Sequence, residues 1–219
     1  LNMSIKRKLE GPIIKSAGTT KCIVIFLHGW GSDGNDLIQI ANVWKNELQQ
    51  TTFIAPNGPE VCTENPLGRQ WFNIMTEEDV MLTELNRAYL DLKEFINIKV
   101  NEYNIEPNNY FLVGFSQGTM LALYTAIREK MSGVLGYSGA FIGKVLDTLE
   151  YRNDFLLIHG NEDKVVPVAR MHNAYQALKE KVNYIDTETY DDLEHSINDK
   201  GLKAGCAFIR KRLDYLLKH

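Results

Sequence analysis

Cysteine is scarce in this sequence, and the scarcity argues against a secreted protein stapled by disulfides. The three cysteines, Cys22, Cys62 and Cys206, are an odd number and have neither metal-ligand nor redox-pair spacing. We therefore predict reduced thiols, a reducing compartment such as the cytoplasm, and no metal site.

Long apolar runs and blocks of one charge are also missing. The longest apolar runs, such as Cys22–Leu27, are far shorter than the roughly 20 residues that a membrane-spanning helix needs. Residues 1–20 lack the continuous apolar core of a secretory signal. The 24 Lys and Arg and the 28 Asp and Glu residues are mixed along the chain, with a formal net charge of −4. We expect no membrane span and no nucleic-acid partner.

Internal repeats, low-complexity segments and long linkers are absent from the 219 residues. Hydrophobic residues make up 44% of the chain, enough for a sizeable core. These properties predict one α/β domain spanning residues 1–219.

What the sequence does contain is an alternation of strand and helix patterns. Strands are predicted at 13–14, 21–27, 52–55, 110–113, 133–137, 154–159 and 183–190. Helices are predicted at 36–49 and 78–103, after residue 118, from near 167, and at 198–217. The alternation predicts a mostly parallel sheet with helices on both faces. The stretch 138–153 is too short for a separate cap domain, and 60–76 is a long irregular connection of the kind that is often functional.

The most informative stretch is Gly114-Phe115-Ser116-Gln117-Gly118, which joins a strand to a helix. In this context Gly-x-Ser-x-Gly holds the serine on a strained turn with its hydroxyl exposed, and side chains at Gly114 or Gly118 would crowd that turn. The helix N-terminus behind Ser116 adds partial positive charge where an oxyanion forms. The bland alternative is a glycine-rich turn that carries a surface serine.

A serine hydroxyl needs a base to remove its proton, and the base needs a partner that fixes its tautomer. Among the five histidines, His219 is terminal, His172 lies on a predicted helix, and His28 and His159 end strands, where a structural hydrogen bond is favoured. His195 lies in a loop after the last strand, at the sheet edge where ligand sites form. Taken alone, it is equally well a surface residue.

The acid is expected between serine and base in the chain, because this fold class uses that order. Asp163 follows the strand that ends at His159, and Glu162 is its immediate rival. Asp191, Asp192 and Glu194 are weaker candidates, since they also suit a solvated loop. A structural reading of Asp163 is a turn residue ahead of a helix.

The tetrahedral intermediate of acyl transfer needs backbone N–H donors. One is expected from Gln117, directly after the nucleophile. The second is expected from Trp30, because Gly29 and Gly31 let that backbone approach closely. The alternative for Trp30 is a hydrophobic plug, and both readings are compatible.

A set of motifs then makes the comparison specific. In chain order they are Phe26-Leu27-His28-Gly29-Trp30-Gly31-Ser32-Asp33-Gly34, Ala55-Pro56-Asn57-Gly58-Pro59, Gln70-Trp71-Phe72, Gly114-Phe115-Ser116-Gln117-Gly118, Gly160-Asn161-Glu162-Asp163-Lys164-Val165-Val166-Pro167 and Glu194-His195-Ser196-Ile197. Together they resemble the phospholipase/carboxylesterase family of α/β-hydrolases, which includes acyl-protein thioesterases, lysophospholipases and small bacterial carboxylesterases. The resemblance covers roughly residues 21–217.

The resemblance implies an α/β-hydrolase fold with Ser116 as nucleophile, Asp163 as acid, His195 as base, and Trp30 and Gln117 as oxyanion donors. It also implies a serine hydrolase that cleaves carboxylic esters or thioesters through an acyl-enzyme, with no metal or organic cofactor. Thioesterase members often carry a smaller aliphatic residue where Trp30 stands, and an indole there would narrow the acyl channel.

Other expectations concern substrate and partners. Trp71 and Phe72 are candidates to line an apolar pocket for a small-molecule or lipid-like acyl ester, with core packing as the alternative for each. Apolar aromatics in this loop also suggest weak membrane-surface contact, and a homodimer is allowed. The competing functions are a lysophospholipase or acyl-protein thioesterase, a peptidase or amidase, and a non-catalytic binding protein on the same fold.

Overall fold

The computed structural model describes residues 7–145 and 149–218. His219 and part of the 138–153 connection lie outside these ranges. The strands of the large sheet are β1 (Ile13–Ile14), β2 (Cys22–Leu27), β3 (Thr51–Ile54), β6 (Tyr110–Phe115), β7 (Gly133–Tyr137), β8 (Asp154–Gly160) and β9 (Tyr184–Tyr190). The helices are α1 (Gly34–Leu37), α2 (Ile40–Trp44), α3 (Glu78–Glu102), α4 (Gln117–Ala126), α5 (Ala169–Leu178) and α6 (Asp199–Leu216).

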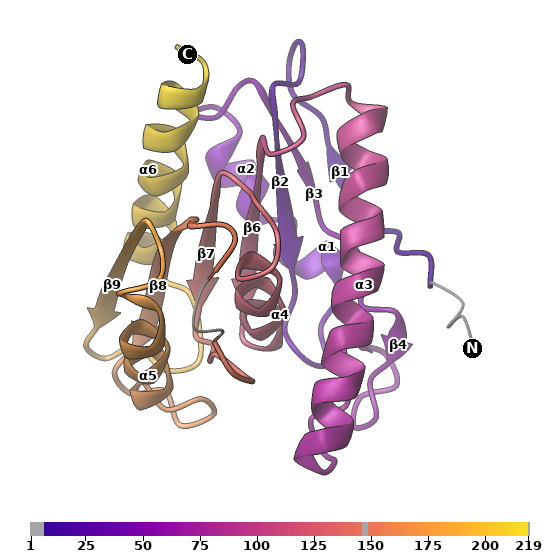
Figure 1. Ribbon diagram of the computed structural model, residues 1–219, viewed down its shortest axis with the longest axis vertical. Helices are drawn as coiled ribbons and strands as arrows, with labels where there is room; N and C mark the ends of the chain where they lie inside the picture. The colour runs from indigo at the N-terminus through magenta and orange to yellow at the C-terminus, as the bar shows by residue number, and fades with distance from the viewer. Residues whose placement is uncertain (1–6, 146–148, 219) are drawn as a thin grey trace.

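The described residues form a seven-stranded sheet in the order β1-β3-β2-β6-β7-β8-β9 (Figure 1). Strand β1 pairs with β3 in antiparallel orientation, and the other neighbours are parallel. The carboxyl ends of β2, β6, β8 and β9 therefore lie at one edge, where the loops after them converge. The predicted α/β-hydrolase fold is confirmed, with no large cap inserted in the described part of the chain.

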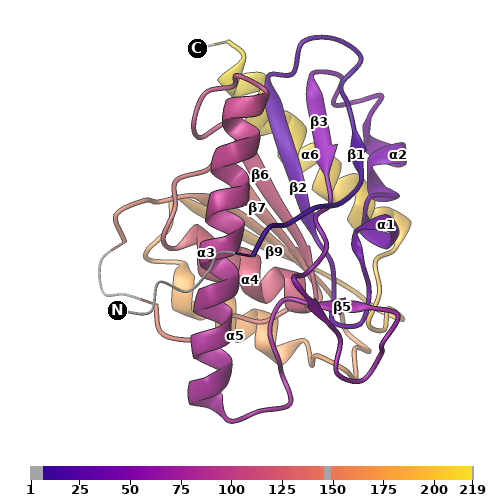
Figure 2. The ribbon, with the colours of Figure 1, turned by 90° about the vertical axis from the view of Figure 1, so that its right-hand side faces the viewer.

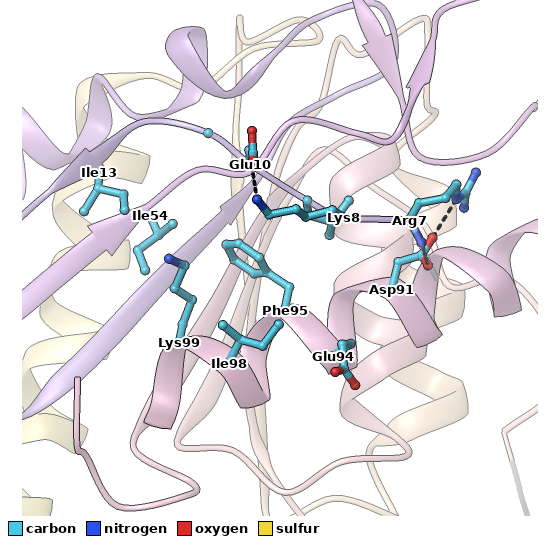
Figure 3. A pocket seen from close by; sticks show the side chains of 12 residues that line it. Arg7, Lys8, Glu10, Ile13, Ile54, Asp91, Glu94, Phe95, Ile98 and Lys99 are labelled. Atoms are coloured by element: carbon cyan, nitrogen blue, oxygen red, sulfur yellow. Dashed lines mark hydrogen bonds and ion pairs between the residues drawn. The ribbon is translucent and has the colours of Figure 1, made fainter. Parts of the chain in front are cut away.

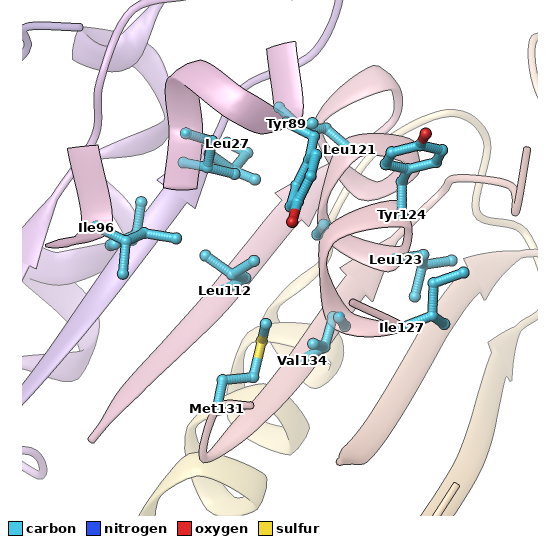
Figure 4. Packing of buried hydrophobic residues seen from close by; sticks show 14 of the residues in the cluster. Leu27, Tyr89, Ile96, Leu112, Leu121, Leu123, Tyr124, Ile127, Met131 and Val134 are labelled. Atoms are coloured by element: carbon cyan, nitrogen blue, oxygen red, sulfur yellow. The ribbon is translucent and has the colours of Figure 1, made fainter. Parts of the chain in front are cut away.

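Helices cover both faces of the sheet. Helices α3, α4 and α5 pack on one face, and α1, α2 and α6 on the other (Figures 1 and 2). On the first face, Leu112 and Val134 of the sheet meet Tyr89 of α3 and Leu121 of α4 (Figure 4). Strands buried on both faces explain the near-continuous apolar runs in the sequence. No helix in the described ranges is both long and apolar enough to cross a membrane.

The predicted helix over 36–49 is instead two short helices, α1 and α2. Asp33 caps α1 through its side chain, which accepts from the Asp36 amide. Tight i to i+3 bonds follow, from the Gln39 amide to Asp36 O and from the Asn42 amide to Gln39 O, and they interrupt the regular helix. The predicted apolar face is still buried, because the turn directs Trp44 into the core beneath α6, where its indole donates to Leu202 O.

The 60–76 connection is also more regular than predicted. It contains a two-stranded antiparallel hairpin, β4 (Glu60–Val61) and β5 (Arg69–Gln70). Strands of two residues carry too little periodicity to be recognised in a sequence. The hairpin lies against the oxyanion loop expected after β2, because the Gly31 amide donates to Arg69 O.

Candidate active site

Ser116 sits where β6 turns into α4, and its backbone is strained. Its φ of 55° and ψ of −114° are unusual for a residue with a side chain. Both motif glycines are required, because a Cβ on Gly114 would lie 2.4 Å from the Thr119 amide nitrogen and one on Gly118 would lie 1.8 Å from Leu27 O. The Ser116 amide donates to Tyr137 O on the neighbouring strand, which anchors the turn.

The structure brings His195 and Asp163 together with Ser116. His195 Nε2 lies 3.0 Å from Ser116 Oγ, and His195 Nδ1 lies 2.7 Å from Asp163 Oδ2. His195 comes from the loop between β9 and α6, and Asp163 from the loop between β8 and α5. These loops can touch because Gly160 has no side chain: a Cβ there would lie 2.0 Å from Leu193 O.

The carboxylate of Asp163 is buried and fixed in orientation. Its Oδ1 accepts from the amides of Val165 and Val166, which leaves Oδ2 for His195. Glu162, the rival from the sequence, is exposed to solvent. The carboxylate favours the His195 tautomer with the hydrogen on Nδ1, so that the lone pair of Nε2 faces Ser116 Oγ.

The expected oxyanion donors lie on segments that pass beside Ser116. Gln117 is the first residue of α4, so its N–H has no acceptor within the helix. A Cβ on Gly29 would lie 3.5 Å from Ser116 Cβ, which places the backbone just before Trp30 against Ser116. The Trp30 indole donates to Gln70 Oε1 on β5 at 3.0 Å, so the side chain is held by the hairpin.

The expectation that Trp71 and Phe72 line an acyl pocket needs correction. Both side chains are buried with no exposed surface and pack in the core. The Trp71 indole donates to His28 O. The Gln117 side chain accepts from the Trp71 amide and donates to Phe72 O. Buried aromatic rings and a braced backbone do not line an open acyl pocket, so the core alternative holds. The sequence did not reveal the bracing role of the Gln117 side chain.

His28 has the structural hydrogen bonds favoured from its place at a strand end. Its Nδ1 lies 2.7 Å from Gly29 O, and its Nε2 accepts from the Gly58 amide at 2.8 Å. Both bonds require the neutral ring with the proton on Nδ1. Burial lowers the pKa of His28, and it also lowers the pKa of His159, which lies near the end of β8.

These two histidines predict a loss of stability in mild acid. In the unfolded chain a histidine takes up a proton below a pH of about 6.5, whereas the folded rings have lowered pKa values and resist protonation. The free energy of unfolding should therefore fall as the pH is lowered from 7.5 to 5.5, because the unfolded chain takes up protons that the folded rings resist. Urea titrations at both values check this, and His28→Gln should show a smaller drop. An equal drop in the two proteins would contradict the assignment.

A cavity of about 400 Å³ lies elsewhere, between the N-terminal segment and α3 (Figure 3). Its rim includes Arg7, whose Nε donates to the buried carboxylate of Asp91 at 2.7 Å. Phe95 and Ile98 contribute apolar surface. The residues that line this cavity do not include the Ser116, His195 or Asp163 cluster, so the two sites are separate.

Comparisons with known proteins agree on a family. The sequence profile of the Phospholipase/Carboxylesterase family matches residues 10–213. The crystal structure of esterase PE8 superposes with a TM-score of 0.87 at 33% identity, covering 93% of this chain and 99% of that one. Acyl-protein thioesterase 1 of Gibberella zeae is 27% identical over 92% of this chain and 94% of its own length. Esterase YpfH of Escherichia coli is 25% identical over 86% and 82%.

The profile match spans most of the chain, and the solved structure shares its fold at an identity above chance. The motifs that suggested the resemblance lie at one edge of the sheet, around Ser116. The chain therefore belongs to the phospholipase/carboxylesterase family of α/β-hydrolases, and it is a serine hydrolase of carboxylic esters or thioesters.

Proposed function

We propose that Ser116 is the nucleophile of this hydrolysis, with His195 as general base and Asp163 as the residue that orients it. The observation that carries the proposal is the unbroken relay from Asp163 Oδ2 to His195 Nδ1 and from His195 Nε2 to Ser116 Oγ. His195 takes the hydroxyl proton as Oγ attacks the acyl carbon. The proton then passes to the leaving alcohol or thiol, and an acyl-enzyme forms.

Hydrolysis of the acyl-enzyme by water completes the reaction. His195 removes a proton from the water, which attacks the acyl-enzyme, and the acid leaves as Ser116 Oγ regains its proton. The amides of Gln117 and Trp30 are proposed to donate to the oxyanion in both steps. The open N–H of Gln117 at the start of α4 and the close approach of Gly29 to Ser116 support this assignment.

The preferred substrates are proposed to be small esters with short or medium acyl chains. The Trp30 indole is bulky, and its bond to Gln70 holds it beside the loop that approaches Ser116. An acyl-protein thioesterase is the alternative, supported by the fungal relatives that carry this name. Lysophospholipase activity remains a third candidate within the family.

A chain-length series distinguishes these substrates. Wild-type protein should hydrolyse nitrophenyl acetate, butyrate and octanoate, with kcat/KM falling for palmitate, and matched acyl thioesters should follow the same order. Trp30→Leu should restore activity toward the longest chain by about tenfold, because a removed indole opens space for several methylenes. A wild-type preference for palmitoyl thioesters would instead favour the thioesterase reading. No hydrolysis of any ester or thioester would refute the proposed function.

The burial of the cysteines and the exposure of apolar side chains bear on the compartment and on membrane contact. Cys22, Cys62 and Cys206 are unpaired and buried, which supports the proposed reducing compartment, the cytoplasm. Trp71 and Phe72 are too buried to touch a membrane. Weak contact with a lipid surface is therefore proposed to rest on exposed apolar side chains of the same connection, chiefly Leu67 and Met75.

A further inference from the structure

His159 is a buried histidine beside the proposed relay that the mechanism above does not use. Its side chain is 1% exposed, and it is the second-last residue of β8, just before the loop that carries Asp163. Its Nε2 lies 2.7 Å from Val166 O and 3.3 Å from Asp163 Oδ2. The ring thus contacts two residues of that loop, Asp163 and Val166.

The neighbours of Nε2 decide where the proton of the ring sits. Val166 O and Asp163 Oδ2 are both acceptors, so Nε2 must carry a hydrogen. Nδ1 then carries a lone pair, and it has no hydrogen-bond partner among the described residues. His159 also lines a cavity of about 10 Å³ with Thr119 and Leu157, which is too small for an organic ligand. The ring is therefore better placed to hold the loop than to bind a second molecule.

Hydrogen bonds around Asp163 hold this loop in its conformation. Asp163 Oδ1 accepts from the amides of Val165 and Val166, and the carbonyl of Val166 accepts from His159. Without the bond from His159 to its carbonyl, Val166 would keep only the bond from its amide to Asp163 Oδ1. The loop would then be less rigid, and the Asp163 carboxylate would be less firmly oriented with Oδ2 toward His195.

We propose that His159 is a positioning residue, whose Nε2–H clamps Val166 and contacts Asp163 so that Oδ2 stays aligned with His195 Nδ1. The inference rests on the proposed function, because it assigns His159 an effect only through Asp163. The inference gives the two buried histidines near strand ends different roles: His28 holds the proposed oxyanion loop, and His159 holds Asp163.

The charge state of the ring matters for the same reason. Burial lowers the pKa of His159, and the ionisable groups that face it are Asp163 and His195. A neutral ring donates one hydrogen bond and leaves the carboxylate charge to His195. A charged ring would pair with Asp163 and compete with His195 for it, so neutrality is part of the role.

A pair of near-isosteric variants tests the donor. His159→Gln keeps an N–H close to the place of Nε2, whereas His159→Met has similar length and no donor. The Met variant should lower kcat by about tenfold to a hundredfold with KM unchanged, because a slightly misplaced group is costly in the transition state. The Gln variant should stay within about threefold of wild type. Equal kcat values for the two variants would overturn the proposal.

A double-mutant cycle separates positioning from a general loss of structure. In the Asp163→Asn background, His159→Met should change kcat by less than about twofold, because the group it acts through is already disabled. A full tenfold loss in that background would overturn the proposal. Leu48→Ala, a buried change at the far end of the sheet, is the control for lowered stability and should keep the wild-type kcat.

The wild-type protein allows a test that needs neither activity nor a folded variant. Long-range ¹H–¹⁵N spectra of the imidazole rings should show His159 as the neutral Nε2–H form at pH 7. The Nδ1–H form, or a charged ring, would overturn the proposal. Because this readout does not depend on hydrolysis, a failure of the proposed function and a failure of this inference give different results.

Discussion

Replacing Ser116 by alanine is expected to lower kcat/KM for nitrophenyl butyrate by a factor of about 10⁴ or more. The substitution removes the hydroxyl that lies 3.0 Å from His195 Nε2, which is the proposed point of attachment of the acyl group. The change is small and leaves the strained turn in place, so the fold should persist. A circular dichroism spectrum and a melting temperature equal to wild type should accompany the lost rate.

Ser132→Ala is the matched control for this experiment. Ser132 is also partly buried, and its hydroxyl donates to Asn108 O at 2.8 Å, but it precedes β7 at the opposite end of the sheet. The kcat/KM of this variant should stay within about twofold of wild type, because Ser132 lies just before the amino end of β7 and far from the proposed relay. A Ser116→Ala protein that kept the wild-type rate would rule out Ser116 as the nucleophile.

The second large effect is on folding, and it comes from the last glycine of the motif. Gly118→Ala should reduce the free energy of unfolding by about 4 kcal/mol or more, or prevent soluble expression. A methyl group there would lie 1.8 Å from Leu27 O and 2.4 Å from Leu27 C, and backbone atoms of a buried strand cannot move aside. In an ordinary helix the same change is stabilising by about 1 kcal/mol, so the sign itself is diagnostic.

Gly18→Ala provides the comparison. Gly18 is exposed, and a Cβ at this position would meet no atom within 4 Å. Its urea unfolding midpoint should match wild type within error, while that of Gly118→Ala should be far lower. If the two variants unfolded at the same urea concentration, the tight contact between α4 and the end of β2 would not exist in solution.

Much of the fold was predictable because its signals are local. The apolar run Cys22–Leu27 and the pattern around Gly114–Gly118 each combine an element with a turn that only certain residues allow. Parallel strands then bring the loops that follow them to one edge, which is why His195 and Asp163 were expected near Ser116. The structure places His195 within hydrogen-bond distance of both Ser116 and Asp163.

What the sequence did not reveal depends on tertiary contacts. Trp71 and Phe72 occupy an irregular connection, so nothing local distinguishes a core side chain from one in a pocket. The Gln117 side chain, which is distant in the sequence, bonds to the backbone of both residues. The contact of His159 with Asp163 is of the same kind, because the loop must close before the ring and the carboxylate meet.

The break between α1 and α2 has a similar cause. The apolar spacing of the segment is helical, and Trp44 and Leu48 are buried as expected. The chain nevertheless tightens after Leu37, where i to i+3 bonds replace those of a regular helix. Apolar spacing predicts which side is buried, but it does not fix whether a helix continues without interruption.

The most direct test of the central claim is to treat wild-type protein with a fluorophosphonate probe and map the modified peptide by mass spectrometry. Such probes react with a serine whose hydroxyl is activated by a neighbouring base. The account predicts one adduct, on Ser116, and a labelling rate at least a hundredfold lower in His195→Ala. An unlabelled wild-type protein, or an adduct on another residue with Ser116 unmodified, would contradict it.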